Sequence, residues 1–150
     1  MGDSVFTPRP PLVRAGAGLI RCVAGPDPAA GAELTITVPQ IAEWRVLGLR
    51  FVLVTSSTSA NRQVDLVIDD GANTVLRIEP PAVQAASLTR GYNYGPGLPA
   101  RTVLTAEFIA PLPVGLVLAG RWRIRTASTN LQAGDNFNGA YLWVEEWLAP

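Results

Sequence analysis

Residues 63–78 read QVDLVIDDGANTVLRI, two runs of alternating apolar and polar residues separated by an Asp-Gly step at 70–71. Val64, Leu66 and Ile68 would share one face of an extended strand, because successive side chains of a strand point to opposite sides. An Asp-Gly step tolerates the positive backbone angles that a tight turn between two strands requires. The stretch therefore predicts a β-hairpin with one buried face.

Three carboxylates in this stretch raise the question of a metal site. Asp65, Asp69 and Asp70 lie close together in the chain, and calcium loops also place acidic groups at alternate positions. Val67 and Ile68, however, belong to the middle of a predicted strand rather than to a loop. We therefore favour a plain hairpin and predict that these carboxylates bind no metal.

The composition favours one folded domain without catalytic groups. The chain has 150 residues, of which 48% are hydrophobic, enough to fill one core. Every basic residue is arginine, so the usual general base, metal ligand and Schiff-base amine are missing. The sequence also lacks a phosphate-binding glycine loop, a nucleophile elbow and a Cys or His pair. We therefore expect a protein that is not an enzyme and needs no cofactor.

Charge and cysteine content limit the partners. The formal net charge is +0 and the arginines are scattered, so we expect neither nucleic acid nor an anionic membrane as a partner. No apolar run reaches the length of a membrane span, and the N-terminus lacks a signal-peptide pattern, so synthesis is expected in the cytoplasm. Cys22 is the only cysteine, which rules out an intrachain disulfide, and we expect it to be buried.

The first 16 residues have the composition of an extended arm. They include Pro8, Pro10 and Pro11, which favour polyproline-like backbone and cannot form the interior of a sheet. We expect residues 1–16 to dock on their own domain or on a neighbouring subunit, and residues 17–150 to form one β-domain.

Beyond the arm, short alternating apolar runs separated by Gly, Pro, Asn and Asp predict an antiparallel β-sandwich. The run EWRVLGLRFVLVT at 43–55 places Leu49 and Phe51 on one face and Trp44 and Val46 on the other, which predicts a central strand covered on both sides. The last strand, in YLWVEEWLAP, is also apolar on both faces. One sandwich would leave part of this surface uncovered, which favours burial against other subunits.

Residues 80–101 read as a long connection rich in Gly, Pro and Tyr, and such connections are usually functional or disordered. Arg90, Tyr92 and Tyr94 make this segment a plausible contact surface, because tyrosine offers a large area and a polar tip. Both tyrosines could equally fold back on the edge of the sandwich. The sequence leaves these two interpretations open.

Residues 121–125 read RWRIR, with two apolar side chains pointing inward and three arginines lining one outer face. Three like charges on one strand need solvent or acidic neighbours. Glu107, Glu145 and Glu146 could supply them within the chain, which is the interpretation we favour. The alternative is an acidic partner surface, to which the planar guanidinium group is well suited.

Three stretches carry a resemblance: LRFVLVTSSTSANRQVDLVIDDG at 49–71, LTRGYNYGPG at 88–97 and GDNFNGAYLWVEEWL at 134–148. Together they resemble small β-rich proteins encoded among bacteriophage virion structural genes, similar in shape to the jelly-roll decoration proteins of tailed-phage capsids. The resemblance implies a jelly roll of about eight strands that cements the capsid surface. It further implies a homo-oligomer, with a trimer expected, that binds the major capsid protein, and it implies no catalytic residue.

The candidate interface residues come from the arm, the tyrosine-rich segment, the arginine strand and the last strand. They are Phe6, Arg9, Arg14, Arg90, Tyr92, Tyr94, Arg121, Arg123, Arg125, Trp143 and Trp147. Two alternative functions remain. One is a phage tail or head-tail component that binds a host receptor through Tyr92 and Tyr94, and the other is a carbohydrate-binding jelly-roll module with a flat aromatic platform.

Overall fold

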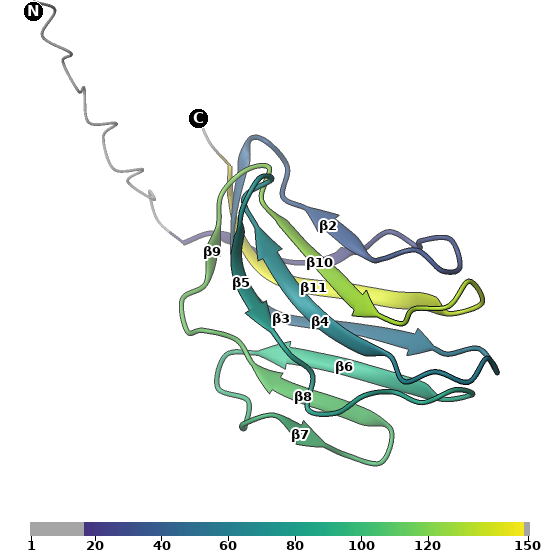
Figure 1. Ribbon diagram of the computed structural model, residues 1–150. Coiled ribbons are helices and arrows are strands. Elements are labelled where there is room, and N and C mark those ends of the chain that lie inside the picture. Colours follow the sequence, from purple (N-terminus) through teal and green to yellow (C-terminus); the bar gives the residue numbers. More distant parts are fainter. Residues whose placement is uncertain (1–16, 149–150) are drawn as a thin grey trace, which may run out of the picture.

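The computed structural model describes residues 17–148, and all regular secondary structure in that range is β-strand (Figure 1). The strands are β1 (Leu19–Ala24), β2 (Thr35–Thr37), β3 (Ala42–Val54), β4 (Gln63–Asp69), β5 (Thr74–Ile78), β6 (Thr89–Gly95), β7 (Thr102–Val103), β8 (Glu107–Pro111), β9 (Val117–Leu118), β10 (Arg123–Thr129) and β11 (Asn136–Leu148).

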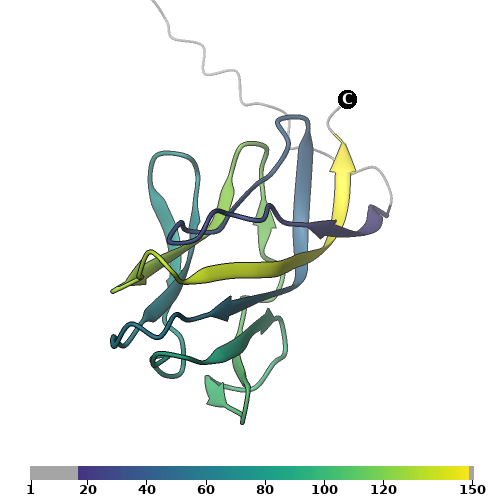
Figure 2. The same ribbon diagram turned by 90° about the vertical axis from the view of Figure 1, so that its right-hand side faces the viewer.

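These strands form two sheets that lie face to face as a β-sandwich (Figures 1 and 2). The large sheet has the strand order β1-β11-β3-β6-β8-β7, with β9 also paired to β3. The small sheet has the order β2-β10-β4-β5. All of these pairs are antiparallel except β6 with β8. The predicted all-β class and two-sheet architecture are therefore confirmed.

One hydrophobic core fills the space between the two sheets. Phe51 of β3 is fully buried at its centre, with its ring centroid 4.9 Å from that of Tyr92 and 5.7 Å from that of Phe137. Val64 of the small sheet is also fully buried. Burying one such side chain contributes roughly 1.5–3 kcal/mol. The inward-facing residues of both sheets thus supply the main stabilisation.

The predicted hairpin is confirmed. Strands β4 and β5 pair antiparallel, and Gly71 in the turn has a φ of 99°, the left-handed conformation that glycine adopts without steric cost. The Asp70 carboxylate accepts hydrogen bonds from the backbone N–H groups of Ala72 and Asn73, at 2.9 and 2.7 Å. The Asp-Gly step therefore forms the turn through its own side chain and backbone.

The prediction that β3 has two apolar faces is wrong. The pairing of β3 with β11 skips one residue at Leu47, which makes a β-bulge. A one-residue insertion inverts the alternation, so Trp44, Val46, Leu49 and Phe51 all lie in the same core cluster. The opposite face of β3 is polar over much of its length, and this strand gives no argument for burial against another subunit.

The prediction of a long connection over residues 80–101 is also wrong. Its centre is β6, an inner strand of the large sheet hydrogen-bonded to β3 and β8. The strand alternates glycine and asparagine with tyrosine and arginine, a composition more typical of a turn. Glycine fits at Gly91 because the carboxylate of Glu107 lies directly over its Cα on the outer face of the sheet. Cross-strand packing therefore overrides the local composition here.

Strand β1 forms one edge of the large sheet, and Cys22 in its middle is exposed. The prediction that Cys22 is buried is wrong, because β1 is exposed along most of its length and packs on the core only through Val23. Residues 17–148 contain no helical segment with the length and hydropathy that a membrane crossing requires.

Candidate binding surfaces

A buried polar cluster ties three loops together at one end of the sandwich. Arg62 and Asp135 are both fully buried and pair with a Nε–Oδ2 distance of 2.8 Å. The second oxygen of Asp135 accepts hydrogen bonds from Arg62 Nη2 and from the Ser56 N–H and hydroxyl. Every polar atom of this pair is directed at the protein, so the cluster is a structural centre and offers no opening to a ligand.

This cluster continues through Gln84 to the core tyrosines. Gln84 pairs with Arg62 through both backbone groups, and its side-chain oxygen accepts a 3.0 Å hydrogen bond from the Tyr92 hydroxyl. Tyr92 and Tyr94 are 0% and 3% exposed. Burial raises the pKa of both phenols. The expectation that these tyrosines present a contact surface is wrong, because β6 turns both side chains into the core.

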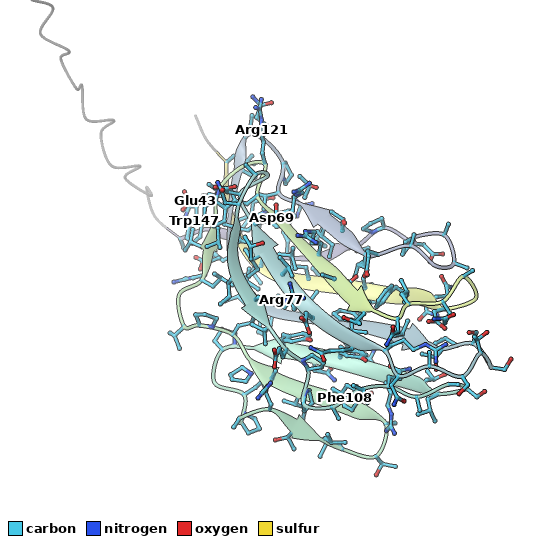
Figure 3. All side chains as sticks on the ribbon, in the orientation of Figure 1. Glu43, Asp69, Arg77, Phe108, Arg121 and Trp147 are labelled. Atoms are coloured by element: carbon cyan, nitrogen blue, oxygen red, sulfur yellow. The ribbon has the colours of Figure 1, made fainter. Side chains whose placement is uncertain are left out.

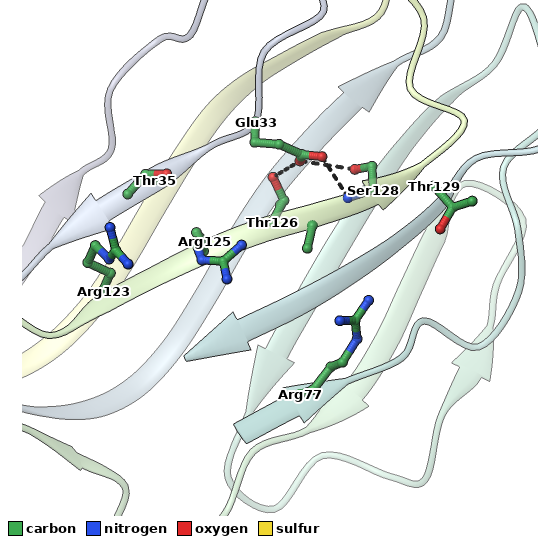
Figure 4. A pocket seen from close by; sticks show the side chains of 9 residues that line it. Glu33, Thr35, Arg77, Arg123, Arg125, Thr126, Ser128 and Thr129 are labelled. Carbon is green, nitrogen blue, oxygen red and sulfur yellow. Dashed lines mark hydrogen bonds between the residues drawn. The ribbon is translucent and has the colours of Figure 1, made fainter. Parts of the chain in front are cut away.

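An open groove of about 540 Å³ lies on the outer face of the small sheet (Figure 4). Three guanidinium groups line it together with hydroxyl groups and one carboxylate. The lining residues are Glu33, Thr35, Arg77, Arg123, Arg125, Thr126, Ala127, Ser128 and Thr129. The three arginines come from β5 and β10, the two strands that flank β4, so the groove runs across the sheet.

Buried aspartates hold these arginines in place from below. Arg123 Nε and Arg125 Nε each donate to a different oxygen of Asp69 at 2.7 Å, and Arg77 Nε donates to Asp65 at 2.6 Å. The two aspartates are 2% exposed, whereas the arginine side chains are 33–55% exposed. The groove therefore presents guanidinium groups to solvent and hides the carboxylates.

Hydrogen bonds favour the ionised form of the Asp69 carboxyl group. Burial by itself would raise the pKa of Asp69, but hydrogen bonds from two guanidinium groups and from the Gly71 N–H outweigh it and lower the pKa below 3.8. Both oxygens are occupied by the arginines. The arginine side chains are fixed in one geometry as a consequence, which reduces the entropy that they lose on binding a ligand.

Some guanidinium nitrogens of the groove are not used in hydrogen bonds within the described residues and face the open side. Within residues 17–148, Nη1 of Arg123 and both Nη atoms of Arg125 make no hydrogen bond to the protein. The one acid in the lining, Glu33, already accepts from Thr126 Oγ1, Ser128 N and Ser128 Oγ. Planar guanidinium donors next to hydroxyl groups suit the carboxylates of a partner.

The structure partly corrects the predicted arginine face. Arg123 and Arg125 share the outer face of β10 as predicted, but Arg121 lies in the preceding turn with a φ of 72° (Figure 3). The acids that neutralise the strand are also different from the predicted glutamates. Asp69 of β4 is the partner, because β10 pairs with β4 and places Arg123 directly opposite it. The sequence does indicate that the aspartates of β4 point outward and could pair with arginines. It does not reveal that β4 and β10 are neighbouring strands.

The predicted glutamate partners have other roles in the large sheet. Glu107 pairs with Arg50 at 3.0 Å. Glu146 accepts 2.7 Å and 2.6 Å hydrogen bonds from Trp44 Nε1 and from Arg21, and Glu145 forms an ion pair with the side chain of Arg45.

A second surface lies on the outer face of the large sheet. Tyr141 and Trp143 alternate with buried residues of β11 and are 52% and 53% exposed. Cys22 of β1 lies opposite Trp143, and Ile20 beside it is 54% exposed. We call Ile20, Cys22, Tyr141 and Trp143 the aromatic patch. Neither aromatic side chain forms a hydrogen bond within the described residues. The predicted exposure of apolar residues on the last strand is therefore confirmed for this part.

The remaining predicted interface residues lie outside the groove and the aromatic patch. Trp147 is half-buried, and the Arg45 guanidinium lies over its ring at 5.5 Å. Arg90 lies over the ring of Phe108 at 5.7 Å and donates to the carbonyl of Thr105. Both side chains serve contacts within the domain. Phe6, Arg9 and Arg14 of the predicted arm lie outside the described residues.

The three carboxylates of the hairpin point in different directions. Asp65 pairs with Arg77, Asp69 pairs with two arginines, and Asp70 binds the backbone of its own turn. Across residues 17–148, no three Cys, Asp or Glu side chains are grouped so that they could hold a metal ion.

Comparison with models of known protein families finds no match, and comparison with curated protein sequences finds no significant similarity.

Proposed function

We propose that this protein is a non-enzymatic virion structural protein that decorates a phage capsid as a homo-oligomer. One observation carries the proposal: the opposite outer faces of the sandwich present two chemically different surfaces. One is the groove lined by Arg77, Arg123 and Arg125, which we call the arginine groove, and the other is the aromatic patch. A protein that joins a lattice needs one surface for the lattice and another for copies of itself. The resemblance of the three sequence stretches to virion structural proteins supplies the biological setting.

The strand order supports assigning the sandwich to the jelly-roll class. When β7, β8 and β9 are treated as an insertion, the eight remaining strands in chain order are arranged 1-8-3-6 and 2-7-4-5 in the two sheets. A jelly roll has eight strands in two Greek keys that alternate between two sheets in this way. Within this insertion, β8 and β7 extend the large sheet beyond β6, and β9 pairs with β3. This assignment agrees with the strand number that the resemblance implies.

We assign the arginine groove to the acidic partner, the major capsid protein. Three guanidinium groups held by buried aspartates can each offer planar donors to surface carboxylates. The three positive charges of the groove are balanced by Asp65, Asp69 and Glu33, so directed hydrogen bonds rather than a strong field would supply the affinity. Specificity for a lattice would then come from many copies of a modest contact.

Co-sedimentation with undecorated heads of the cognate phage tests this function. The Arg125→Ala variant should lose at least tenfold in occupancy, because it removes two guanidinium nitrogens that face the open side, while Asp69 keeps its hydrogen bond from Arg123. Arg101→Ala is the matched control, since Arg101 is an exposed arginine whose only ion pair in the described chain is a 3.4 Å contact with Glu79. Equal occupancy of both variants, or no binding of the wild-type protein, would contradict the proposal.

A carbohydrate-binding module is the second candidate function, favoured by Tyr141 and Trp143. These rings lie two residues apart on one strand face and are half exposed, and exposed aromatic rings can form a flat binding platform. A glycan array with wild type and Trp143→Ala separates the two functions. Glycan binding that Trp143→Ala abolishes, with capsids ignored, would favour the module. The receptor-binding alternative loses its support, because it relied on the buried Tyr92 and Tyr94.

A further inference from the structure

The aromatic patch is an exposed apolar surface on a sheet whose opposite face already covers the core. Tyr141 and Trp143 contribute two large rings, and Ile20 and Cys22 extend the surface across β1. In the described chain, no hydrogen bond is made by the Tyr141 hydroxyl or the Trp143 indole N–H. Rings that expose both an apolar face and an unused donor are typical of sites that bind a partner.

The chain itself contains a segment with complementary chemistry. Residues 5–13, outside the described range, read VFTPRPPLV. Proline-rich segments favour the polyproline helix, which has no internal hydrogen bonds and therefore leaves its carbonyl groups free to accept. Recognition of such segments by aromatic-lined surfaces is a recurring binding mode, because the helix loses little entropy on docking.

The spacing of the prolines in the segment is similar to the spacing of the two aromatic residues in the patch. Residues three apart in a polyproline helix, the spacing of Pro8 and Pro11 in the sequence, lie on the same side of that helix about 9 Å apart. Tyr141 and Trp143 are two residues apart on a strand, a Cα separation of about 7 Å, which is close to that repeat. Each ring can therefore contact one proline, while its polar group reaches a nearby carbonyl.

The point where the segment joins the domain favours a neighbouring copy over the same copy. Strand β1 runs from Leu19, opposite Glu146, towards Ala24, opposite Tyr141. Followed backwards from Ala24 to Leu19, β1 therefore runs away from Tyr141 and Trp143 and ends beside Ile20, at one end of its own aromatic patch. With residues 5–13 docked, residues 14–18 link them to β1 and can span about 17 Å when extended, which reaches a copy beside this edge of the sheet, whereas docking on the rings of the same copy would require the chain to reverse direction.

We propose that residues 5–13 of one copy dock on the aromatic patch of a neighbouring copy and thereby hold the homo-oligomer together. The inference deepens the proposed function, since it rests on the homo-oligomer named there. It assigns the oligomer contact to the large sheet and leaves the arginine groove on the opposite face free for the capsid.

Sedimentation velocity of the full chain over a range of concentrations tests the contact. The wild-type protein should associate, and association should weaken at least tenfold in Tyr141→Ala/Trp143→Ala and in Pro8→Ala/Pro10→Ala/Pro11→Ala. Val75→Ala is the control and should associate like the wild type, because Val75 is 51% exposed on the small sheet. A wild-type monomer at every concentration, or unchanged association of the patch variant, would overturn the proposal.

A peptide experiment identifies the segment directly. A synthetic peptide of residues 1–16, in excess, should dissociate the wild-type oligomer, and a peptide with the three prolines replaced by alanine should not. Failure of the native peptide to compete would overturn the docking of this segment. Capsid binding is measured separately: self-association that follows these rules in a protein that ignores capsids would sustain this inference and refute the proposed function.

Discussion

Two arginine–aspartate clusters in this protein have the same chemistry and opposite surroundings. The side chains of Arg62 and Asp135 are both 0% exposed and bind backbone groups of the β3–β4 and β10–β11 loops. In the groove cluster, Asp69 is buried but the side chains of Arg123 and Arg125 are 38% and 33% exposed. One cluster directs every donor inward, and the other leaves donors for a partner.

The difference teaches that an arginine's role depends on where its unused donors point. Removing one partner from a buried pair leaves an unpaired charge in a low-dielectric interior, which is strongly destabilising. A half-exposed arginine can be hydrated after its partner is lost, so it contributes little to folding. We therefore expect substitutions at the buried cluster to affect stability and substitutions at the groove to affect association.

The largest expected effect is that of Asp135→Ala. It leaves the fully buried Arg62 without its carboxylate and should lower the free energy of unfolding by about 3–5 kcal/mol. Urea denaturation measures this loss, with Glu79→Gln in the exposed Arg101–Glu79 pair as the control, expected within about 1 kcal/mol. Comparable losses in both variants would show that burial does not make this ion pair more important for stability than an exposed one.

Lowering the pH should cause the second-largest loss in the free energy of unfolding, again through the buried cluster. Burial alone would raise the pKa of Asp135, but hydrogen bonds from Arg62, Gln132 and Ser56 outweigh it and lower the pKa from 3.8 to about 2. A folded-state pKa below the unfolded value contributes stability above the unfolded pKa, and that stability is lost as the pH falls through the folded pKa. We expect a loss of about 2 kcal/mol between pH 5 and pH 2 from this group. Denaturation at a series of pH values measures it, and a flat profile over this range would contradict the assignment.

Two core tyrosines test whether a buried polar group stabilises the fold only when it is hydrogen-bonded. The Tyr92 hydroxyl donates to Gln84, whereas the buried Tyr94 hydroxyl has no hydrogen-bond partner among residues 17–148. Tyr92→Phe should therefore destabilise the fold by about 1 kcal/mol, and Tyr94→Phe should be neutral or stabilising. Chemical denaturation of the two variants side by side decides this. Equal losses would show that the hydrogen bond to Gln84 contributes nothing.

Substitutions in the groove should change stability least. Arg123→Ala or Arg125→Ala leaves Asp69 with the other arginine, so the expected change is about 0–1 kcal/mol. Thermal melting measures this, alongside capsid co-sedimentation of the same variants. A large loss of melting temperature with intact capsid binding would assign these arginines to the fold.

Calcium or magnesium should have no effect on the melting temperature. A ligand that binds only the folded state must raise its stability, but the hairpin carboxylates are occupied by arginines and by their own turn. Melting curves with either cation and with a chelator measure this. A chelator-sensitive shift would show that one of these aspartates binds a metal.

The sequence predicts local features of this protein well. The Asp-Gly turn, the inward direction of Val64, Leu66 and Ile68 and the outward direction of Arg123 and Arg125 appear as expected. The prediction that only one face of β4 is buried is wrong, because arginines of the neighbouring strands cover its outer face. These features depend on the period-two geometry of a strand and on residues that are neighbours in the chain. The absence of histidine and lysine is likewise a property of the sequence alone, and it limits the chemistry open to the protein whatever its fold.

The tertiary structure decides which side chains meet. Arg62 and Asp135 are 73 residues apart in the chain, and Asp69 and Arg125 are 56 residues apart, so no local pattern could pair them. The bulge at Leu47 shifts the faces of β3 by one residue, and pairing with β3 and β8 turns β6 into an inner strand. The physical reason is that strand geometry is set by neighbouring residues, whereas strand pairing and register are set by packing between distant segments.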